Sequence, residues 1–415
     1  MSVALGEVLL LETPPALAAA VTRAARAERV ALDVESNGLH VFRAGLCVVQ
    51  LAWLEPSGAA DGPASVVVAV VDPLAVPVAP LGPLLGAAGP VKVLHDLTFD
   101  ARLLAEAGVP VARVRDTSVA ARLLGHQATG LATLLASELG VHVDKRLQHH
   151  DWSRRPLGPD ELAYLAGDVR HLLALDAHLE RAAAERDLAP EIDDECAYKL
   201  GTALAPPRDP RPGYVKAKGA SGLDTLGRAV LRRLWLAREA AAEAADVPPF
   251  KIVSSETLVE LAGKRPASAA ALATVRGAVA GQAGRHVEAW LRAIADGEGD
   301  GALPAEESAL FTAASPAREE MARRRGREVQ VIGWRRAEAA RRGVDDQAIL
   351  PGHCAHDVMD ALLAYDARPD AEALREALAR VPGLGARRLA RYGDALAALA
   401  AAPPPAPGGA ARRPA

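Results

Sequence analysis

The segment from Arg29 to Glu35 reads RVALDVE and places two acidic residues, Asp33 and Glu35, at the end of an otherwise mostly apolar run. Apolar, β-branched residues between turn residues predict a strand. Residues i and i+2 of a strand project from the same face, so the two carboxylates point the same way. Two negative charges this close repel each other unless a cation lies between them. By itself, an acidic pair at a strand end is typical of a solvated edge.

Strands and helices are predicted to alternate on both sides of this segment. Further β-branched apolar runs predict strands at 7–11, 46–53, 65–71, 91–95 and 111–114. Apolar residues at helical spacing predict helices at 14–27, through Leu103 and Leu104, after Asp116-Thr117, at 131–139 and at 160–185. Residues 1–203 are therefore expected to form an α/β domain with a mixed sheet flanked by helices.

Two further acidic positions lie in these predicted helices. Asp100 falls one turn into the helix that follows the 91–95 strand, where an acidic residue also complements the helix dipole. Tyr164 and Asp168 are four residues apart and share a helix face, a pattern that a half-buried Tyr with a surface Asp would also give. The four carboxylates, Asp33, Glu35, Asp100 and Asp168, together form an all-oxygen ligand set, which suits two Mg²⁺ or Mn²⁺ ions better than Zn²⁺.

In order and approximate spacing, these residues resemble the three motifs of the DEDD exonuclease superfamily, in its tyrosine type. The segment K-x-x-Q-x-x-D-W-x-x-R-P-L at 145–157 resembles ribonuclease D in particular, as do His95 and Asp116-Thr117. This similarity covers residues 3–200. It implies an RNase H-like exonuclease domain in which Asp33, Glu35, Asp100 and Asp168 carry two divalent cations and Tyr164 orients the attacking water.

The resemblance also places three residues at family positions without sharp roles, and we expect them to bind substrate: His95, Asp116 and Arg155. Two departures from the ribonuclease D pattern lie beside the motifs. Ser36 follows Glu35 where an aromatic residue is usual, and Leu165 follows Tyr164 where a small residue is usual. The first departure affects how the terminal base is held, and neither alters the ligand set.

The second half of the chain is predicted to be helical. Residues 204–219 are rich in Pro, Lys and Gly and predict a linker. Two related blocks follow, with their first tryptophans at Trp235 and Trp334. They resemble two small all-α helicase-and-RNase-D C-terminal (HRDC) domains, at 220–298 and 316–402. The Pro/Gly/Ala-rich tail, 403–415, is expected to be disordered.

Two features of the second block suggest contacts with nucleic acid. The segment VPGLGARR at 381–388 resembles a hairpin between helices, whose free backbone N–H groups could hold a phosphate through Gly383, Gly385 and Arg387. An ordinary glycine-capped turn explains it equally well. Residues 318–342 contain nine Arg and four Glu, a local positive patch that could follow a phosphate backbone.

The overall composition limits the partners and the cellular compartment that the protein can have. The net charge of −4 gives the protein no overall positive field that would indicate a nucleic-acid partner, so any contacts with RNA must come from local positive patches. Three widely spaced cysteines predict neither disulfides nor a zinc site. The chain shows no signal peptide and no apolar stretch of about 20 residues, so we expect a cytoplasmic protein without a membrane partner, and a monomer.

These features predict a metal-dependent 3′–5′ exoribonuclease that releases nucleoside 5′-monophosphates. The resemblance implies that it trims the 3′ ends of tRNA precursors and small structured RNAs. Two alternatives remain: an exonuclease that acts on DNA, and a non-catalytic RNA-binding protein with a nuclease fold. The second is disfavoured because all four carboxylates and Tyr164 are present. A chain cut near Ala220 is expected to leave a folded nuclease.

Overall fold

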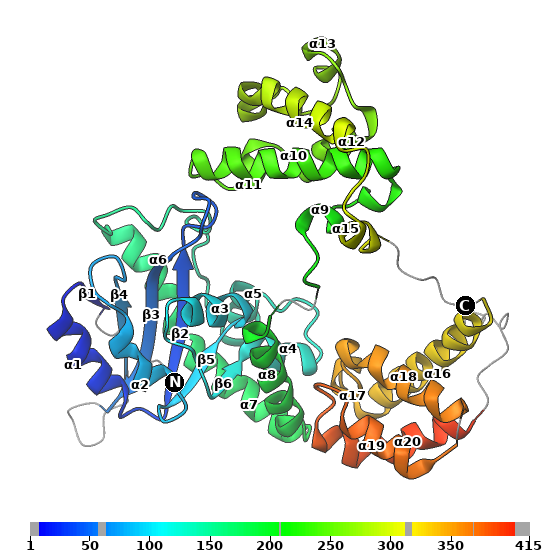
Figure 1. Cartoon of the computed structure of the whole chain (residues 1–415). Helices are drawn as coiled ribbons and strands as arrows, with labels where there is room; N and C mark the ends of the chain where they lie inside the picture. The colour runs from blue at the N-terminus through cyan, green and yellow to red at the C-terminus, as the bar shows by residue number, and fades with distance from the viewer. Residues whose placement is uncertain (1–7, 57–63, 207–208, 312–317, 368, 403–415) are drawn as a thin grey trace.

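The computed structural model describes residues 8–56, 64–206, 209–311, 318–367 and 369–402, with the side chains of 318–319 and 367 excepted. Glu7, expected to begin the first strand, and the tail 403–415 lie outside this part. Figure 1 shows a sheet-containing domain and two helical bodies, one formed by α9–α15 and one by α16–α20. Among the helices described, none combines the length and apolar character needed to cross a bilayer.

The sheet has six strands in the order β1-β4-β3-β2-β5-β6. β2, β3 and β4 pair antiparallel, whereas β1 with β4, β2 with β5 and β5 with β6 pair parallel, which confirms the mixed sheet. The last strand begins later than the sequence predicts, because 111–113 only lead into it. The strands are β1 (Val8–Leu11), β2 (Arg29–Ser36), β3 (Leu46–Glu55), β4 (Ser65–Val71), β5 (Val91–Leu94) and β6 (Val114–Asp116).

Side chains alternate between two buried layers of the sheet. One layer packs on α1 (Pro14–Ala24), α2 (Gly82–Leu85) and α3 (Thr98–Glu106). The other packs on α4 (Thr117–Leu123), α5 (Leu131–Leu139), α6 (Pro159–Arg170) and α7 (Leu172–Glu185). A short 3₁₀ turn, η1 (Ala79–Leu81), precedes α2.

Two helices differ from the expectation. The helix predicted at 160–185 is divided at His171, so that α6 covers β2, β3 and β4 while α7 covers β2 and β5. A further helix, α8 (Ala189–Leu204), follows α7 and packs on α3, α4 and β6. Its few buried side chains join both layers, with Ile192 and Cys196 in one and Ala203 in the other.

The first helical body has its own core. Its elements are α9 (Gly213–Lys216), η2 (Ala220–Gly222), α10 (Thr225–Ala244), α11 (Pro249–Ile252), α12 (Ser255–Lys264), α13 (Ala269–Leu272), η3 (Gly281–His286), α14 (Val287–Asp300) and α15 (Ala305–Ala309). Tyr214 and Val215 are buried in that core. The linker is therefore shorter than the expected 204–219, because its second half is part of the helical body.

The second helical body consists of α16 (Arg318–Arg342), α17 (Asp346–Ile349), α18 (Gly352–Ala367), α19 (Ala371–Ala379) and α20 (Ala386–Ala401). It has a core of its own, and it also packs against the nuclease domain, α17 on α4 and α20 on α8 (Figure 1). Ala348 is fully buried in the core layer formed by α4–α8. The first body makes lighter contact, through the loop between β2 and β3.

Candidate active site

Asp33 and Glu35 lie on the same face of β2, near the end of the strand. Their direct partners on β3 are Gln50 and Val48, and the register shifts between Glu35 and Ser36. The irregularity follows the acidic pair directly, and Ser36 then pairs with Leu46. Val48, opposite Glu35, packs in one apolar cluster with Leu165 of α6, so both carboxylates lie on the sheet face that α6 covers.

Asp168 reaches the same place from α6. Carboxylate oxygens of Asp33, Glu35 and Asp168 all lie within 4.8 Å of one another. Leu165, one turn earlier, is fully buried against a cluster that contains Val48 of the sheet. The large residue at this position thus anchors α6 on the sheet and does not intrude on the acidic cluster.

Asp100, in the first turn of α3, is the fourth acidic residue. It is 5% exposed, and its Oδ2 has no hydrogen-bond partner among the described residues. Burial raises the pKa of the Asp100 carboxyl well above its usual range, and the charge of Asp33 raises it further. A buried carboxylate oxygen without a donor is costly unless a cation binds it.

The cluster is electrostatically unbalanced. Burial raises the pKa of Asp33 to about 7. Burial, with the charges of Asp33 and Asp168, raises that of Glu35 to about 9. Burial and the charge of Asp33 raise the pKa of Asp168 to about 8. Among the described residues, no ion pair involves any of these carboxylates or Asp100. An all-carboxylate set of this kind fits a hard divalent cation.

Tyr164 lies one turn before Asp168 on α6, half-buried beside Trp152, whose ring centroid is 5.6 Å away. Burial raises the pKa of the Tyr164 phenol, and the charge of Asp168 raises it further. The hydroxyl therefore keeps its proton at neutral pH and is available as a hydrogen-bond donor.

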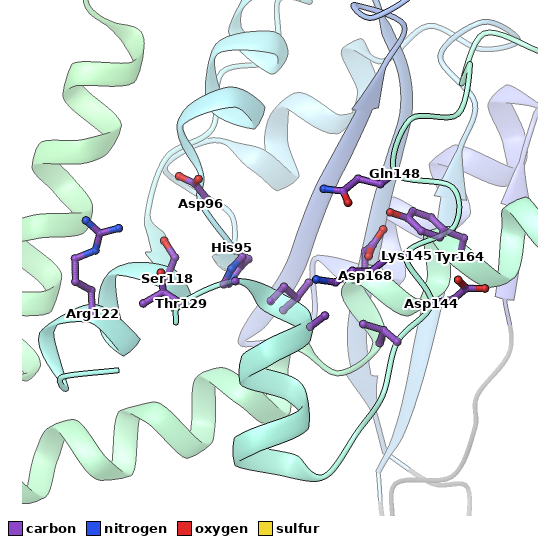
Figure 2. A pocket seen from close by; sticks show the side chains of 14 residues that line it. His95, Asp96, Ser118, Arg122, Thr129, Asp144, Lys145, Gln148, Tyr164 and Asp168 are labelled. Carbon is purple, nitrogen blue, oxygen red and sulfur yellow. The ribbon is translucent and has the colours of Figure 1, made fainter. Parts of the chain in front are cut away.

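A cavity of about 360 Å³ opens beside Tyr164 and Asp168. Figure 2 shows Gln148, Lys145 and Asp144 grouped with these two residues, with Arg122 and Ser118 at the opposite end. The cavity is polar and contains cationic side chains, so it suits the sugar and phosphate groups of a nucleotide strand.

His95 lines this cavity, between the two ends (Figure 2). Its Nδ1 lies 2.8 Å from the Thr117 hydroxyl, which itself donates to the Leu94 carbonyl. Burial lowers the pKa of the His95 imidazole. The structure thus places His95 where substrate contact is feasible, with one ring nitrogen engaged by the protein.

Asp116 has a different environment from the one the sequence suggests. It is 1% exposed, and its carboxylate accepts hydrogen bonds from the backbone N–H groups of Asp96, Leu97 and Ser118. Lys199 of α8 lies 2.7 Å from it. Both oxygens of Asp116 are thus engaged within the protein, and two of these bonds hold the loop that leads into α3, the helix that carries Asp100. Lys199 was not identified from the sequence, since α8 was not predicted.

Arg155 likewise points into the protein. Its guanidinium binds both oxygens of Asp72, which is 2% exposed, and donates to the carbonyl of Cys47. These bonds fasten the segment before α6 to the ends of β3 and β4. The contacts of Arg155 among the described residues are therefore structural, and its contact with substrate stays a prediction.

The hairpin at 381–388 packs on α8. A Cβ at Gly383 would meet Tyr198 and His353, and one at Gly385 would meet Asp194. Arg387 forms an ion pair with Asp187. The phosphate site expected here is not what this geometry supports, because the glycines allow the nuclease domain to approach the hairpin backbone closely.

The Arg-rich segment is also largely used within the protein. Arg327 is 1% exposed and binds Asp366 and the last carbonyls of α20. Other arginines of α16 pair with acidic residues, namely Arg324 with Asp360, Arg335 with Asp346, Arg341 with Glu338 and Arg342 with Glu191. The positive excess in the sequence thus overstates the charge available to RNA.

Comparison with known proteins identifies the family. The 3′–5′ exonuclease family matches residues 10–183. Ribonuclease D of Gluconacetobacter diazotrophicus is 34% identical over 308 residues, which cover 72% of this chain and 75% of that protein. Ribonuclease D of Granulibacter bethesdensis is 33% identical, with 72% and 74% covered. The chain belongs to the ribonuclease D family. As a family member it is a 3′–5′ exoribonuclease.

The HRDC domain family matches residues 227–294, within the first helical body. The second body lies outside both matched ranges, so its identity as an HRDC domain is not shown. Solved structures of similar fold include a protein from Bifidobacterium adolescentis, with a TM-score of 0.72 at 21% identity, covering 95% of this chain and 97% of that one. Escherichia coli RNase D has a TM-score of 0.65 at 21% identity, with 95% and 98% covered. At this identity, both show the fold alone.

Proposed function

We propose that Asp33, Glu35, Asp100 and Asp168 hold two divalent cations, Mg²⁺ or Mn²⁺, over which the last phosphodiester of an RNA 3′ end is cleaved. The observation that carries this proposal is the convergence of three carboxylates within 4.8 Å, together with the partnerless Oδ2 of Asp100. Bound cations of this kind activate water and stabilise the leaving oxygen. The four carboxylates supply the negative charge that retains them.

Tyr164 is the residue proposed to orient the attacking water. Its phenol keeps its proton, because burial raises its pKa, and it lines the cavity next to Asp168. A neutral hydroxyl can hold a water molecule by hydrogen bonding without adding a charge to the cluster. Holding the water in a fixed orientation lowers the activation barrier.

The proposed substrate is a structured RNA with a single-stranded 3′ tail, such as a tRNA precursor. The polar cavity next to Asp168 would receive the tail, and the first helical body, with its HRDC match, would contact the structured part. E. coli RNase D is described as an exoribonuclease involved in structured RNA processing, which agrees with this substrate class. Such a role would place the protein in the cytoplasm, and we expect it to act as a monomer.

The test uses 5′-labelled RNA and DNA of identical sequence, each with a 3′ tail, incubated with purified protein in Mg²⁺, Mn²⁺ or EDTA. We expect stepwise shortening of the RNA from its 3′ end, nucleoside 5′-monophosphate as the product, and no cleavage in EDTA. Full activity in EDTA would contradict the metal site. Faster shortening of DNA would favour the DNA exonuclease, and binding without cleavage would favour a non-catalytic protein.

A further inference from the structure

Gln50 is a polar residue in the middle of β3, and the residues before and after it along the strand are apolar. It lies on β3 directly opposite Asp33 of β2 and Val70 of β4. Directly paired residues of antiparallel strands project from the same face, so Gln50 lies on the face that carries the acidic cluster. It is 0% exposed.

Neither polar atom of the Gln50 side chain has a hydrogen-bond partner among the described residues. A buried amide in this state costs free energy, because it has lost water without gaining another partner. Val48 and Val70 beside it belong to one apolar cluster, and a third aliphatic side chain would continue that surface without this cost. A local departure from good packing of this kind is expected at functional sites.

The nearest functional group fixed by the strand register is the Asp33 carboxylate. Side chains directly opposite on paired strands have Cβ atoms about 4.5–5.5 Å apart, which a Gln side chain spans easily. Asp33 has no ion-pair partner among the described residues. Carboxylates that bind metals generally accept further hydrogen bonds, which fix their orientation. An amide supplies such a donor without introducing a positive charge that would compete with a cation.

We propose that Gln50 is a positioning residue, whose amide donates a hydrogen bond to Asp33 and orients this carboxylate for the cations. The inference rests on the proposed metal site and adds a residue to it. Gln50 touches neither the cations nor the RNA, and acts through Asp33. With the cations bound, Asp33 would turn toward this amide and supply the partner that Gln50 lacks among the described residues.

Gln50→Met tests the idea, because the thioether has a similar length and flexibility but donates no hydrogen bond. We expect the affinity of the metal-free protein for Mg²⁺, measured by calorimetric titration, to fall ten- to hundred-fold, as for other residues that orient metal ligands. At limiting Mg²⁺ the kcat on 3′-tailed RNA should fall while the KM for RNA stays unchanged. The melting temperature in EDTA should be unchanged or higher, because an unpaired amide has been removed.

Val70→Ala is the matched control, because Val70 pairs with Gln50 from the other side on the same face. It removes packing and no hydrogen bond, so the melting temperature in EDTA should fall while the affinity for Mg²⁺ stays within about twofold of wild type. Gln50→Met should therefore lower the affinity for Mg²⁺ without lowering the melting temperature, and Val70→Ala should lower the melting temperature without lowering that affinity.

The outcomes separate this inference from the proposed function. If the wild-type protein shows no Mg²⁺ binding, the metal site itself is refuted, and the role of Gln50 with it. If wild type binds Mg²⁺ and Gln50→Met binds it equally well with unchanged kcat, the metal site stands and the positioning role is refuted. Weaker Mg²⁺ binding by both Gln50→Met and Val70→Ala would also refute it, since any change in packing would then disturb the site.

Discussion

At the scale of single residues, the carboxyl groups of the candidate active site link the stability of the metal-free protein to pH. In the unfolded chain these groups lose their protons near pH 4. In the folded protein the pKa values of Asp33, Asp168 and Glu35 are about 7, 8 and 9, raised chiefly by burial. The folded state therefore binds more protons between these limits, and its stability falls as the pH rises.

We accordingly predict that in EDTA the melting temperature falls between about pH 6 and pH 9, and that Mg²⁺ restores more of it at the higher pH. Calorimetric scans across this range measure both effects. Asp168→Asn is the control, because it removes one charge from the cluster. It should melt higher than wild type at pH 9 in EDTA and gain little from Mg²⁺. A wild-type melting temperature that rises with pH in EDTA would contradict the prediction.

The same residues make a prediction about turnover. Asp33→Asn and Asp168→Asn should each lower kcat by several orders of magnitude, because each removes a ligand charge. Tyr164→Phe should lower it less, since only the orientation of water is lost. Single-turnover cleavage measures the rates, and RNA binding, which should persist in all three variants, is measured separately. A Tyr164→Phe enzyme as inactive as Asp168→Asn would mean that the hydroxyl does more than orient.

Patterns in the sequence predicted which side chains share a face of a strand or helix, but not which groups each polar side chain contacts. Strand alternation placed Asp33 and Glu35 together, and helical spacing placed Tyr164 near Asp168; both follow from local geometry. That these two pairs lie close together in space was predicted from the family resemblance. Asp116 shows the limit, because the sequence marks it as a notable acid, whereas its oxygens are occupied by backbone N–H groups from a loop 20 residues away.

At the scale of secondary structure, the segment before α6 depends on Arg155. Its bidentate bond to the buried Asp72 joins this segment to the ends of β3 and β4. Without the Arg155 guanidinium, the buried Asp72 carboxylate loses its ion-pair partner. Burial by itself raises the pKa of Asp72, and the bonds with Arg155 keep it low. We predict that Arg155→Ala destabilises the protein by about 3 kcal/mol.

Thermal or chemical unfolding measures that loss, and RNA binding across a salt series distinguishes the structural role from a substrate contact. If Arg155 held a phosphate, its removal would make the salt dependence less steep. We expect the slope to stay unchanged for the folded variant. A stable Arg155→Ala protein with a shallower slope would restore the role that the sequence suggested.

Helices and strands were predictable where burial is one-sided and strong. The helix at 131–139 was predicted within its observed bounds, and the strand at 65–71 likewise. α8 was missed because its buried positions are few and spread over two layers, so no single apolar stripe marks it. The break between α6 and α7 at His171 was not predicted, because the helical spacing of apolar residues continues across it. Only the structure shows that the two helices cover different strands.

At the scale of the whole molecule, the sequence indicates separate domains but does not show which of them pack against each other. The arginines of the last body give no local sign that their partners lie on α8. Glu191 is fully buried and pairs with Arg391 at 2.8 Å, and Arg342 lies 3.7 Å away. Arg388 is also fully buried and contacts the Glu191 carbonyl. This interface changes the expectation for a shortened chain.

A nuclease that ends near Ala220 was expected to fold with little loss, because the linker offers few contacts. The structure instead predicts that removing the last body, by ending the chain at residue 311, lowers the melting temperature. Ala348 leaves the nuclease core, and Glu191 loses its arginines. Because the hairpin and much of α16 face inward or pair internally, the salt dependence of RNA binding should change little.

Glu191→Gln, introduced into both chains, tests whether this interface is the cause. In the full chain the substitution should lower the melting temperature, because Arg391 and Arg342 lose a charged partner in a buried setting. In the chain ending at 311 those arginines are absent, so the same substitution should have little effect. The difference between the two effects, measured as free energies of unfolding, is the coupling between Glu191 and the last body. Equal effects in both chains would mean that the ion pairs do not hold the last body on α8, and that its attachment relies on the apolar contact around Ala348.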